Sequence, residues 1–143
     1  MADRTPERIL ARAGILLVVL ALLTGLAIPA FTNPRQALAA HVSGVMNGLL
    51  LVALSALWGR LVLSAAQLRL ARTTALAGTY ANWVGSCLAA AWGTSRLTPV
   101  AGAGYEAAPW QETLVQLVQV SQGVALLLAL ALVVFGLRRA VPA

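Results

Sequence analysis

Four stretches of mostly apolar residues divide this chain, and they constrain its fold more than any other feature. A membrane-spanning helix needs about 20 such residues, and the stretches cover residues 9–30, 37–58, 73–92 and 110–137. Hydrophobic residues make up 60% of the 143 residues and charged residues only 10%, whereas a soluble domain usually carries about 25% charge. The sequence therefore predicts an all-α protein, a polytopic membrane four-helix bundle, with residues 1–143 as a single transmembrane domain.

The breaks between the stretches contain residues that end or start helices. Asn33 is disfavoured in a helix because Pro34 follows it, and Pro34 suits the first turn of the next helix. Residues 93–109 contain three glycines and two prolines, so we expect the longest and least regular loop there. A cleaved secretory signal is disfavoured, because the bulky Ile28 and Pro29 precede Ala30 and make a poor cleavage site.

The arginines indicate how the helices are oriented. Ten residues are basic, all of them arginine, and the net charge is +6. They are scattered singly at the ends of apolar stretches, which is unlike the basic stripe of a nucleic-acid-binding surface. Only Arg35 and Arg96 belong to one side of the predicted bundle, and eight belong to the other: Arg4, Arg8, Arg12, Arg60, Arg69, Arg72, Arg138 and Arg139. Because cytoplasmic loops are enriched in arginine, we expect both termini in the cytoplasm.

Polar residues inside the apolar stretches are informative because they are costly in a membrane. In the predicted topology, one group of them lies between mid-membrane and the outer surface: His41, Asn47, Asn82, Ser86, Glu112, Gln116 and Gln119. Three helices contribute to this layer, which favours a polar pocket in the outer half of the bundle or between subunits. The alternative is that these side chains only hold helices together, at about 0.6 to 2 kcal/mol each.

His41 is the single histidine, and it shares a helix face with Gly44 and Gly48. Two small residues four apart allow another backbone or a flat ligand to approach closely. Asn47 lies six residues from His41, which on a helix is about 9 Å along the axis and about 120° around it, so the two can flank one crevice. With one histidine, ligation of haem by two histidines of the same chain is excluded. Cys87 is the only cysteine, so no intramolecular disulfide forms.

Several sequence blocks resemble the bacterial hydroxylaminobenzene mutases, in the same order along nearly the whole chain. The blocks are residues 24–29, 33–35, 41–48, 78–83, 89–93 and 111–114. The resemblance implies a multi-pass protein of the bacterial inner membrane that converts hydroxylaminobenzene to 2-aminophenol during nitroarene breakdown. This reaction is an isomerisation without net redox change.

A more distant resemblance is to styrene oxide isomerase, another small four-helix membrane isomerase. That family has a histidine, five intervening residues and then Asn-Gly on its second helix, which correspond to His41 and Asn47-Gly48. The resemblance implies that His41 binds the iron of haem b, that the haem lies between subunits of a trimer, and that ferric iron acts as a Lewis acid. It also implies that Asn47 holds the substrate. An aspartate and a tyrosine of that family fall near Gly78 and Ser86 here, so the match is incomplete.

These arguments combine into one expected site for an aromatic hydroxylamine. His41 ligates the haem iron, and Gly44 and Gly48 give the macrocycle room. Asn47, Tyr80 and Asn82 orient the substrate, and Trp83 packs on its ring. Glu112 is either the proton acceptor or a structural acid.

Two other hypotheses are kept open. One is a haem-free isomerase in which Glu112, Tyr80 and His41 act as acid–base groups. The other is a non-enzymatic membrane protein, either a small transporter or a subunit of a larger complex.

Overall fold

The computed structural model describes residues 5–138 and consists, within them, of four long helices and two short 3-10 turns. The helices are α1 (Thr5–Leu26), α2 (Pro34–Leu57), α3 (Ala65–Trp92) and α4 (Pro109–Leu137). The 3-10 turns η1 (Ile28–Ala30) and η2 (Trp58–Arg60) follow α1 and α2. This confirms the all-α membrane bundle. Arg4 and Arg139, which the orientation argument counts, lie outside the described residues.

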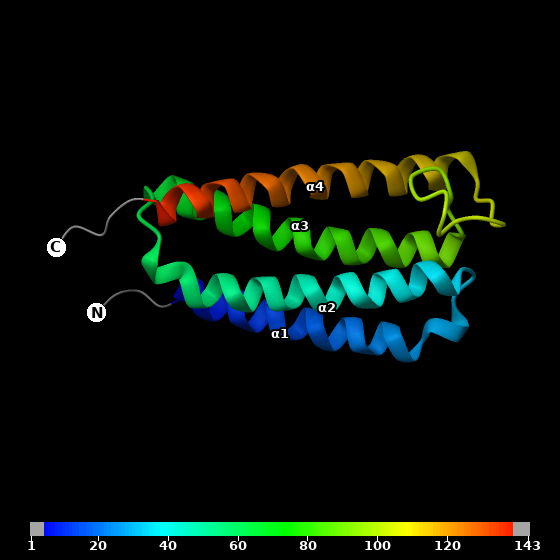
Figure 1. Ribbon diagram of the computed structural model, residues 1–143, viewed down its shortest axis with the longest axis horizontal. Coiled ribbons are helices and arrows are strands. Elements are labelled where there is room, and N and C mark those ends of the chain that lie inside the picture. The colour runs from blue at the N-terminus through cyan, green and yellow to red at the C-terminus, as the bar shows by residue number, and fades with distance from the viewer. Residues whose placement is uncertain (1–4, 139–143) are drawn as a thin grey trace.

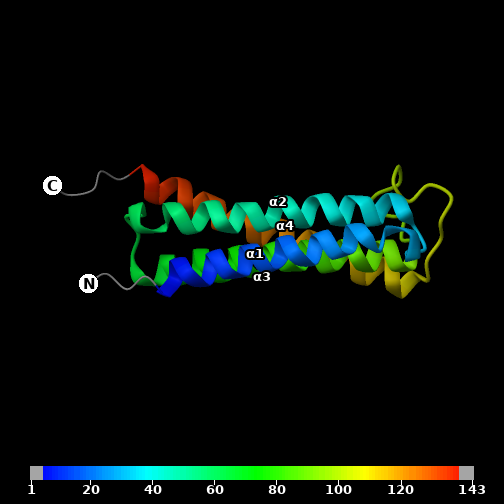
Figure 2. The ribbon, with the colours of Figure 1, turned by 90° about the horizontal axis from the view of Figure 1, so that it is seen from below.

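The four helices run side by side along one long axis (Figures 1 and 2). α1 packs on α2, α2 on α3, and α3 on α4. In Figure 2, α2 lies on one side of the bundle and α1 and α3 on the other, while α4 crosses obliquely from the α3 side at its start to the α2 side at its end. The start of α1, the connection between α2 and α3, and the end of α4 are at one end, and the loop of residues 93–108 is at the other. The arginine-rich segments therefore meet at a single end.

The helix boundaries follow from local capping. The Asn33 side chain accepts hydrogen bonds from the backbone N–H groups of Arg35 and Gln36, with Pro34 in the first turn of α2. α3 begins eight residues earlier than expected, because Ser64 and Gln67 form a reciprocal capping box. It ends at Gly93, whose φ of 70° a residue with a side chain rarely adopts.

Three segments are long and apolar enough to cross a membrane: α1, Pro34–Arg60 and α4. α3 does not meet the same criterion, because polar and small residues such as Asn82 lower its hydropathy along its length, in addition to Arg69 and Arg72 in its first turns. It nevertheless packs along both α2 and α4. The most polar helix of the bundle is thus shielded from lipid on two sides.

A layer of leucine and alanine side chains forms the core near the arginine-rich end; its buried members include Leu10, Leu17, Leu51, Leu54, Ala71, Ala75 and Ala129. Large apolar side chains also cover the outside of the bundle, as expected for a surface in contact with lipid. Among the most exposed are Leu26, Met46 and Leu127.

Candidate active site

His41 lies on α2 at the contact with α1. Its Nδ1 atom is 2.8 Å from the carbonyl oxygen of Ala21. Because a carbonyl oxygen only accepts, Nδ1 carries the hydrogen and Nε2 keeps its lone pair. Gly25 makes the approach feasible, since a Cβ atom there would be 2.7 Å from Nδ1. Within residues 5–138, no hydrogen bond to Nε2 is formed.

This arrangement of His41 fits a metal-ligating histidine, whose second ring nitrogen typically donates to a carbonyl or carboxylate. The described residues contain no cluster of three His, Cys, Asp or Glu side chains that would hold a bare metal ion. A single histidine ligand suits a haem iron, because the porphyrin supplies the other in-plane ligands. The chemistry of the His41 side chain is therefore compatible with a residue that would hold haem b.

Gly44 and Gly48 both lie where α2 packs closely on its neighbours. A Cβ atom on Gly44 would lie 2.7 Å from the side chains of Ala21 and Trp83. A Cβ atom on Gly48 would lie 2.6 Å from the carbonyl oxygen of Gly14. α1 and Trp83 lie against both glycines, so within the described residues the two glycines allow close packing. Their expected place beside a haem stays a prediction.

Asn47 and Asn82 are brought together as a pair. The Nδ2 atom of Asn47 donates to Oδ1 of Asn82 over 3.1 Å, which links α2 to α3. Both residues are half-buried. Asn47 contacts α3 whereas His41 contacts α1, in keeping with their angular separation of about 120° around α2. That they flank one crevice stays a prediction.

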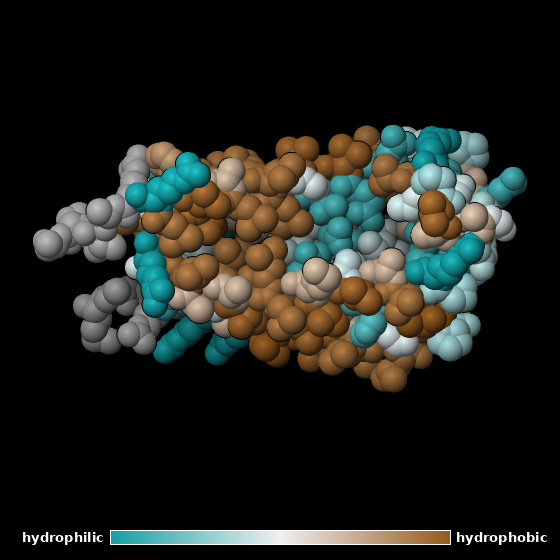
Figure 3. Space-filling model, in the orientation of Figure 1, coloured by the Kyte–Doolittle hydropathy of each residue, from teal (hydrophilic) through white to brown (hydrophobic). Residues whose placement is uncertain are grey.

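A second polar contact connects α3 to α4 beside this pair. Gln119 Nε2 donates to Ser86 Oγ over 3.0 Å, and Gln122 Nε2 donates to Gln119 Oε1 over 3.2 Å. Ser86 lies one helical turn from Asn82 on α3. We call Asn47, Asn82, Ser86, Gln119 and Gln122 the amide cluster. Figure 3 shows hydrophilic side chains gathered between α2 and α4 near the middle of the bundle, next to hydrophobic side chains on the arginine-rich half and on the same side as the hydrophilic loop end.

Gln122 was missed by the sequence analysis, although a signal for it was present. The sequence places Glu112, Gln116 and Gln119 of α4 in the polar layer, and Gln122 follows Gln119 by three residues on the same helix. An amide at the middle of a 29-residue apolar helix is itself a sign of function or of a specific partner.

Tyr80 and Trp83 point from α3 toward α1. The Tyr80 hydroxyl donates to the Ala13 carbonyl oxygen over 2.8 Å, and Trp83 Nε1 donates to Thr24 Oγ1 over 3.1 Å. Ala13 and Ala21 are eight residues apart on α1, about 12 Å along the axis. Tyr80 and His41 therefore bind α1 at separate levels.

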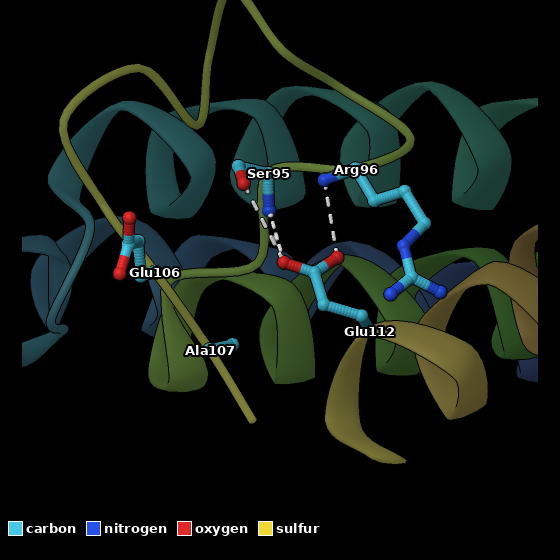
Figure 4. Close-up of a pocket in the computed structure, with 5 residues that line it drawn as sticks. All are labelled: Ser95, Arg96, Glu106, Ala107 and Glu112. Atoms are coloured by element: carbon cyan, nitrogen blue, oxygen red, sulfur yellow. Dashed lines mark hydrogen bonds between the residues drawn. The ribbon is translucent and has the colours of Figure 1, made fainter. Parts of the chain in front are cut away.

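Glu112 lies at the start of α4, under the loop of residues 93–108. Its Oε1 accepts from the backbone N–H of Ser95 over 2.8 Å, and its Oε2 accepts from the backbone N–H of Arg96 over 3.1 Å (Figure 4). The carboxylate is buried and borders a cavity of about 250 Å³. These contacts favour the structural role that the sequence left open for Glu112.

The same loop is tied to the start of α2. Asn33 Nδ2 donates to the Ala101 carbonyl oxygen over 2.9 Å, Gln36 donates to the carbonyl oxygen of Thr94, and the Arg35 guanidinium donates to that of Ala103. The loop is irregular, as predicted, and it is held firmly over one end of the bundle.

A bundle of apolar helices with an available imidazole and an amide cluster between its helices defines a class: integral membrane proteins with a polar site inside the membrane layer. The chain belongs to the styrene oxide isomerase family, whose sequence profile matches residues 6–138. It is similar to hydroxylaminobenzene mutase HabB of Ectopseudomonas oleovorans, with 40% identity over 139 residues, or 96% of this chain and 85% of the relative. No solved structure matches the chain significantly.

These similarities identify the protein as a membrane isomerase. They correct the hypothesis of a non-enzymatic transporter or complex subunit. They also confirm the family resemblance that the sequence blocks indicated.

Proposed function

We propose that this isomerase converts hydroxylaminobenzene to 2-aminophenol by intramolecular hydroxyl transfer. The observation that carries the proposal is the 40% identity to a hydroxylaminobenzene mutase along 96% of the chain. In this reaction the N–O bond breaks and a C–O bond forms at the ortho carbon. The ortho hydrogen leaves as a proton and the nitrogen gains one, so substrate and product are isomers.

His41 is the residue proposed to hold haem b, through its free Nε2 atom. When bound, ferric haem supplies a Lewis acid for the substrate oxygen. The hydrogen bond from Nδ1 to the Ala21 carbonyl oxygen fixes the ring and its tautomer, which second-sphere partners of ligating histidines do in general.

Asn47 and Asn82, which meet at the α3 side of α2 rather than at the α1 side where His41 lies, are the side chains proposed to orient the substrate. Asn47 and Asn82 hold each other in place, and their remaining amide atoms offer one acceptor and one donor to a neutral substrate. The apolar outside of the bundle suits an aromatic molecule that partitions into lipid. Excluding water matters because attack by water on an electron-poor ring would give other products.

The haem-free acid–base mechanism is less well supported by the geometry. It requires His41, Tyr80 and Glu112 to act on one substrate. His41 and Tyr80 bind α1 at levels about 12 Å apart, and Glu112 holds the loop backbone with both of its oxygens. The three groups do not converge.

The proposal also includes the assembly and the location. We place the protein in the bacterial inner membrane with both termini in the cytoplasm, and we expect a homo-oligomer such as a trimer, with the haem between subunits. The gathering of the arginine-rich segments at one end of the bundle supports the orientation. Exposed apolar side chains such as Val42 and Met46 on α2 leave a surface for a second copy.

Two measurements test this proposal. Membranes containing the protein are incubated with hydroxylaminobenzene, and 2-aminophenol is quantified by chromatography; we expect product only when the protein is present. The purified protein is then examined for a Soret band, which we expect in the wild type and not in His41→Ala. A colourless preparation with full activity, or full activity in His41→Ala, would refute the haem part. Absence of product would refute the reaction.

A further inference from the structure

One amide oxygen in the middle of the membrane-spanning layer lacks a partner. Within residues 5–138, Gln122 Oε1 is the only buried side-chain nitrogen or oxygen without a hydrogen bond. Gln122 lies at the middle of α4, where lipid offers no donor. A buried polar atom without a hydrogen bond is unfavourable. The position therefore calls for a donor that this part of the chain does not supply.

The hydrogen bonds around Gln122 show which atom of its side-chain amide is available to a ligand. Gln122 Nε2 donates to Gln119 Oε1, and Gln119 is in turn held by Ser86. The NH₂ end of Gln122 is thus engaged and its oxygen is left as the acceptor. In the amide cluster, Asn82 Nδ2 and Asn47 Oδ1 also form no hydrogen bond within the described residues, but neither atom is buried.

Apolar side chains flank Gln122, and the surface of α4 at the next residue is open. A Cβ atom built on Gly123, the next residue of α4, meets no atom within 4 Å. Val118 and Leu126, one turn to either side, pack against Gly85 and Gly78 of α3. No charged side chain contributes to the amide cluster. Such a place suits a neutral molecule with an apolar ring and a hydrogen-bond donor.

We propose that Gln122 is a specificity-determining residue that accepts a hydrogen bond from the N–H or O–H group of the aromatic substrate. This inference rests on the proposed function, because an aromatic hydroxylamine is the neutral donor that it names. Gln119 acts as a positioning residue that holds the Gln122 amide. The substrate reaches the amide cluster from the face between α2 and α4, where the hydrophilic area of Figure 3 lies.

Binding without turnover tests this role. Isothermal titration measures the affinity of the purified holoprotein for 2-aminophenol, which carries N–H and O–H donors, and for 2-methoxy-N,N-dimethylaniline, in which methyl groups replace them. Gln122→Leu and Gln122→Met remove the acceptor, the second with little change in length. Gln116→Leu is the matched control, since Gln116 is a half-buried glutamine of the same helix outside the amide cluster.

We expect both Gln122 variants to bind 2-aminophenol about tenfold more weakly, as loss of one hydrogen bond implies, and to bind the methylated compound like the wild type. Gln116→Leu should change neither affinity. The inference is wrong if the wild type binds neither compound, if the Gln122 variants keep wild-type affinity, or if they weaken both compounds equally. It is also wrong if they change the oligomeric mass in light scattering and leave the affinities unchanged.

The turnover assay separates this inference from the proposed function. Donor-dependent binding through Gln122 in a protein that forms no 2-aminophenol would refute the mutase reaction and leave the binding site intact. An active wild-type enzyme whose binding is indifferent to Gln122 would refute the role of Gln122 and leave the reaction intact.

Discussion

Asn47 and Asn82 form the hydrogen bond that links α2 to α3 within the amide cluster. Hydrogen bonds between membrane helices contribute about 0.6 kcal/mol on average and up to about 1.7 kcal/mol. We expect a double-mutant cycle with Asn47→Leu and Asn82→Leu to give a coupling energy in this range, measured by reversible unfolding in detergent micelles. Strictly additive effects of the two changes would mean that the pair is not formed in the folded protein.

Glu112 gives a second prediction for a single residue. Its carboxylate accepts from two backbone N–H groups of the loop, and hydrogen bonds to a charged group contribute about 1.5 to 3 kcal/mol. Glu112→Ala should lower the thermal midpoint of the purified protein and keep most of the mutase activity at low temperature. Loss of activity at an unchanged midpoint would instead support Glu112 as the proton acceptor.

For single residues, the sequence predicted which helix positions are polar better than it predicted the partners of those side chains. The depth of Asn47 and Asn82 follows from helix spacing alone, and the structure places them in contact. The sequence did not predict which helix packs on Gly44 and Gly48 or which loop covers Glu112. These tertiary contacts are not encoded by the residues next to them in the sequence. Gln122 was not predicted, because the predicted polar layer on α4 ends at Gln119, three residues before it.

Close packing of α1 on α2 depends on glycine. A Cβ atom on Gly48 would lie 2.6 Å from the Gly14 carbonyl oxygen and 2.9 Å from the backbone nitrogen of Val18. We expect Gly48→Ala to separate the two helices and to lower the free energy of unfolding by about 1 to 3 kcal/mol. The unfolding midpoint in detergent measures the loss.

Gly123 provides the matched control on α4, because a Cβ atom there meets nothing within 4 Å. Gly123→Ala should leave the stability unchanged or raise it by up to about 1 kcal/mol, since alanine favours helix more than glycine. Equal destabilisation by Gly48→Ala and Gly123→Ala would contradict the close contact between α1 and α2.

The first and last residues of a helix were predicted well where a change in apolar composition marks the helix boundary. The boundaries predicted for α2 and α4 agree with the structure to within a few residues. Both helices begin at a proline, Pro34 and Pro109, which suits the first turn of a helix. The sequence placed the start of α3 at residue 73, because Arg69 and Arg72 interrupt the apolar pattern. The Ser64–Gln67 capping box, itself visible in the sequence, starts this helix earlier.

For the molecule as a whole, the orientation in the membrane can be tested with single cysteines. In a Cys87→Ser background, Val100→Cys introduces a thiol in the exposed loop and Ser64→Cys introduces one at the arginine-rich end. A membrane-impermeant maleimide should label Val100→Cys in intact bacterial spheroplasts, and Ser64→Cys only after the membrane is permeabilised. The reverse pattern would overturn the cytoplasmic placement of the termini.

The order of packing along the bundle has a consequence for biogenesis. α1 with α2, and α3 with α4, are each neighbours in the chain and in space. Each pair is thus a helical hairpin that can leave the ribosome and enter the bilayer before the next one is synthesised. Two polypeptides divided within residues 61–64 and produced together in one cell should accordingly reassemble into a working enzyme.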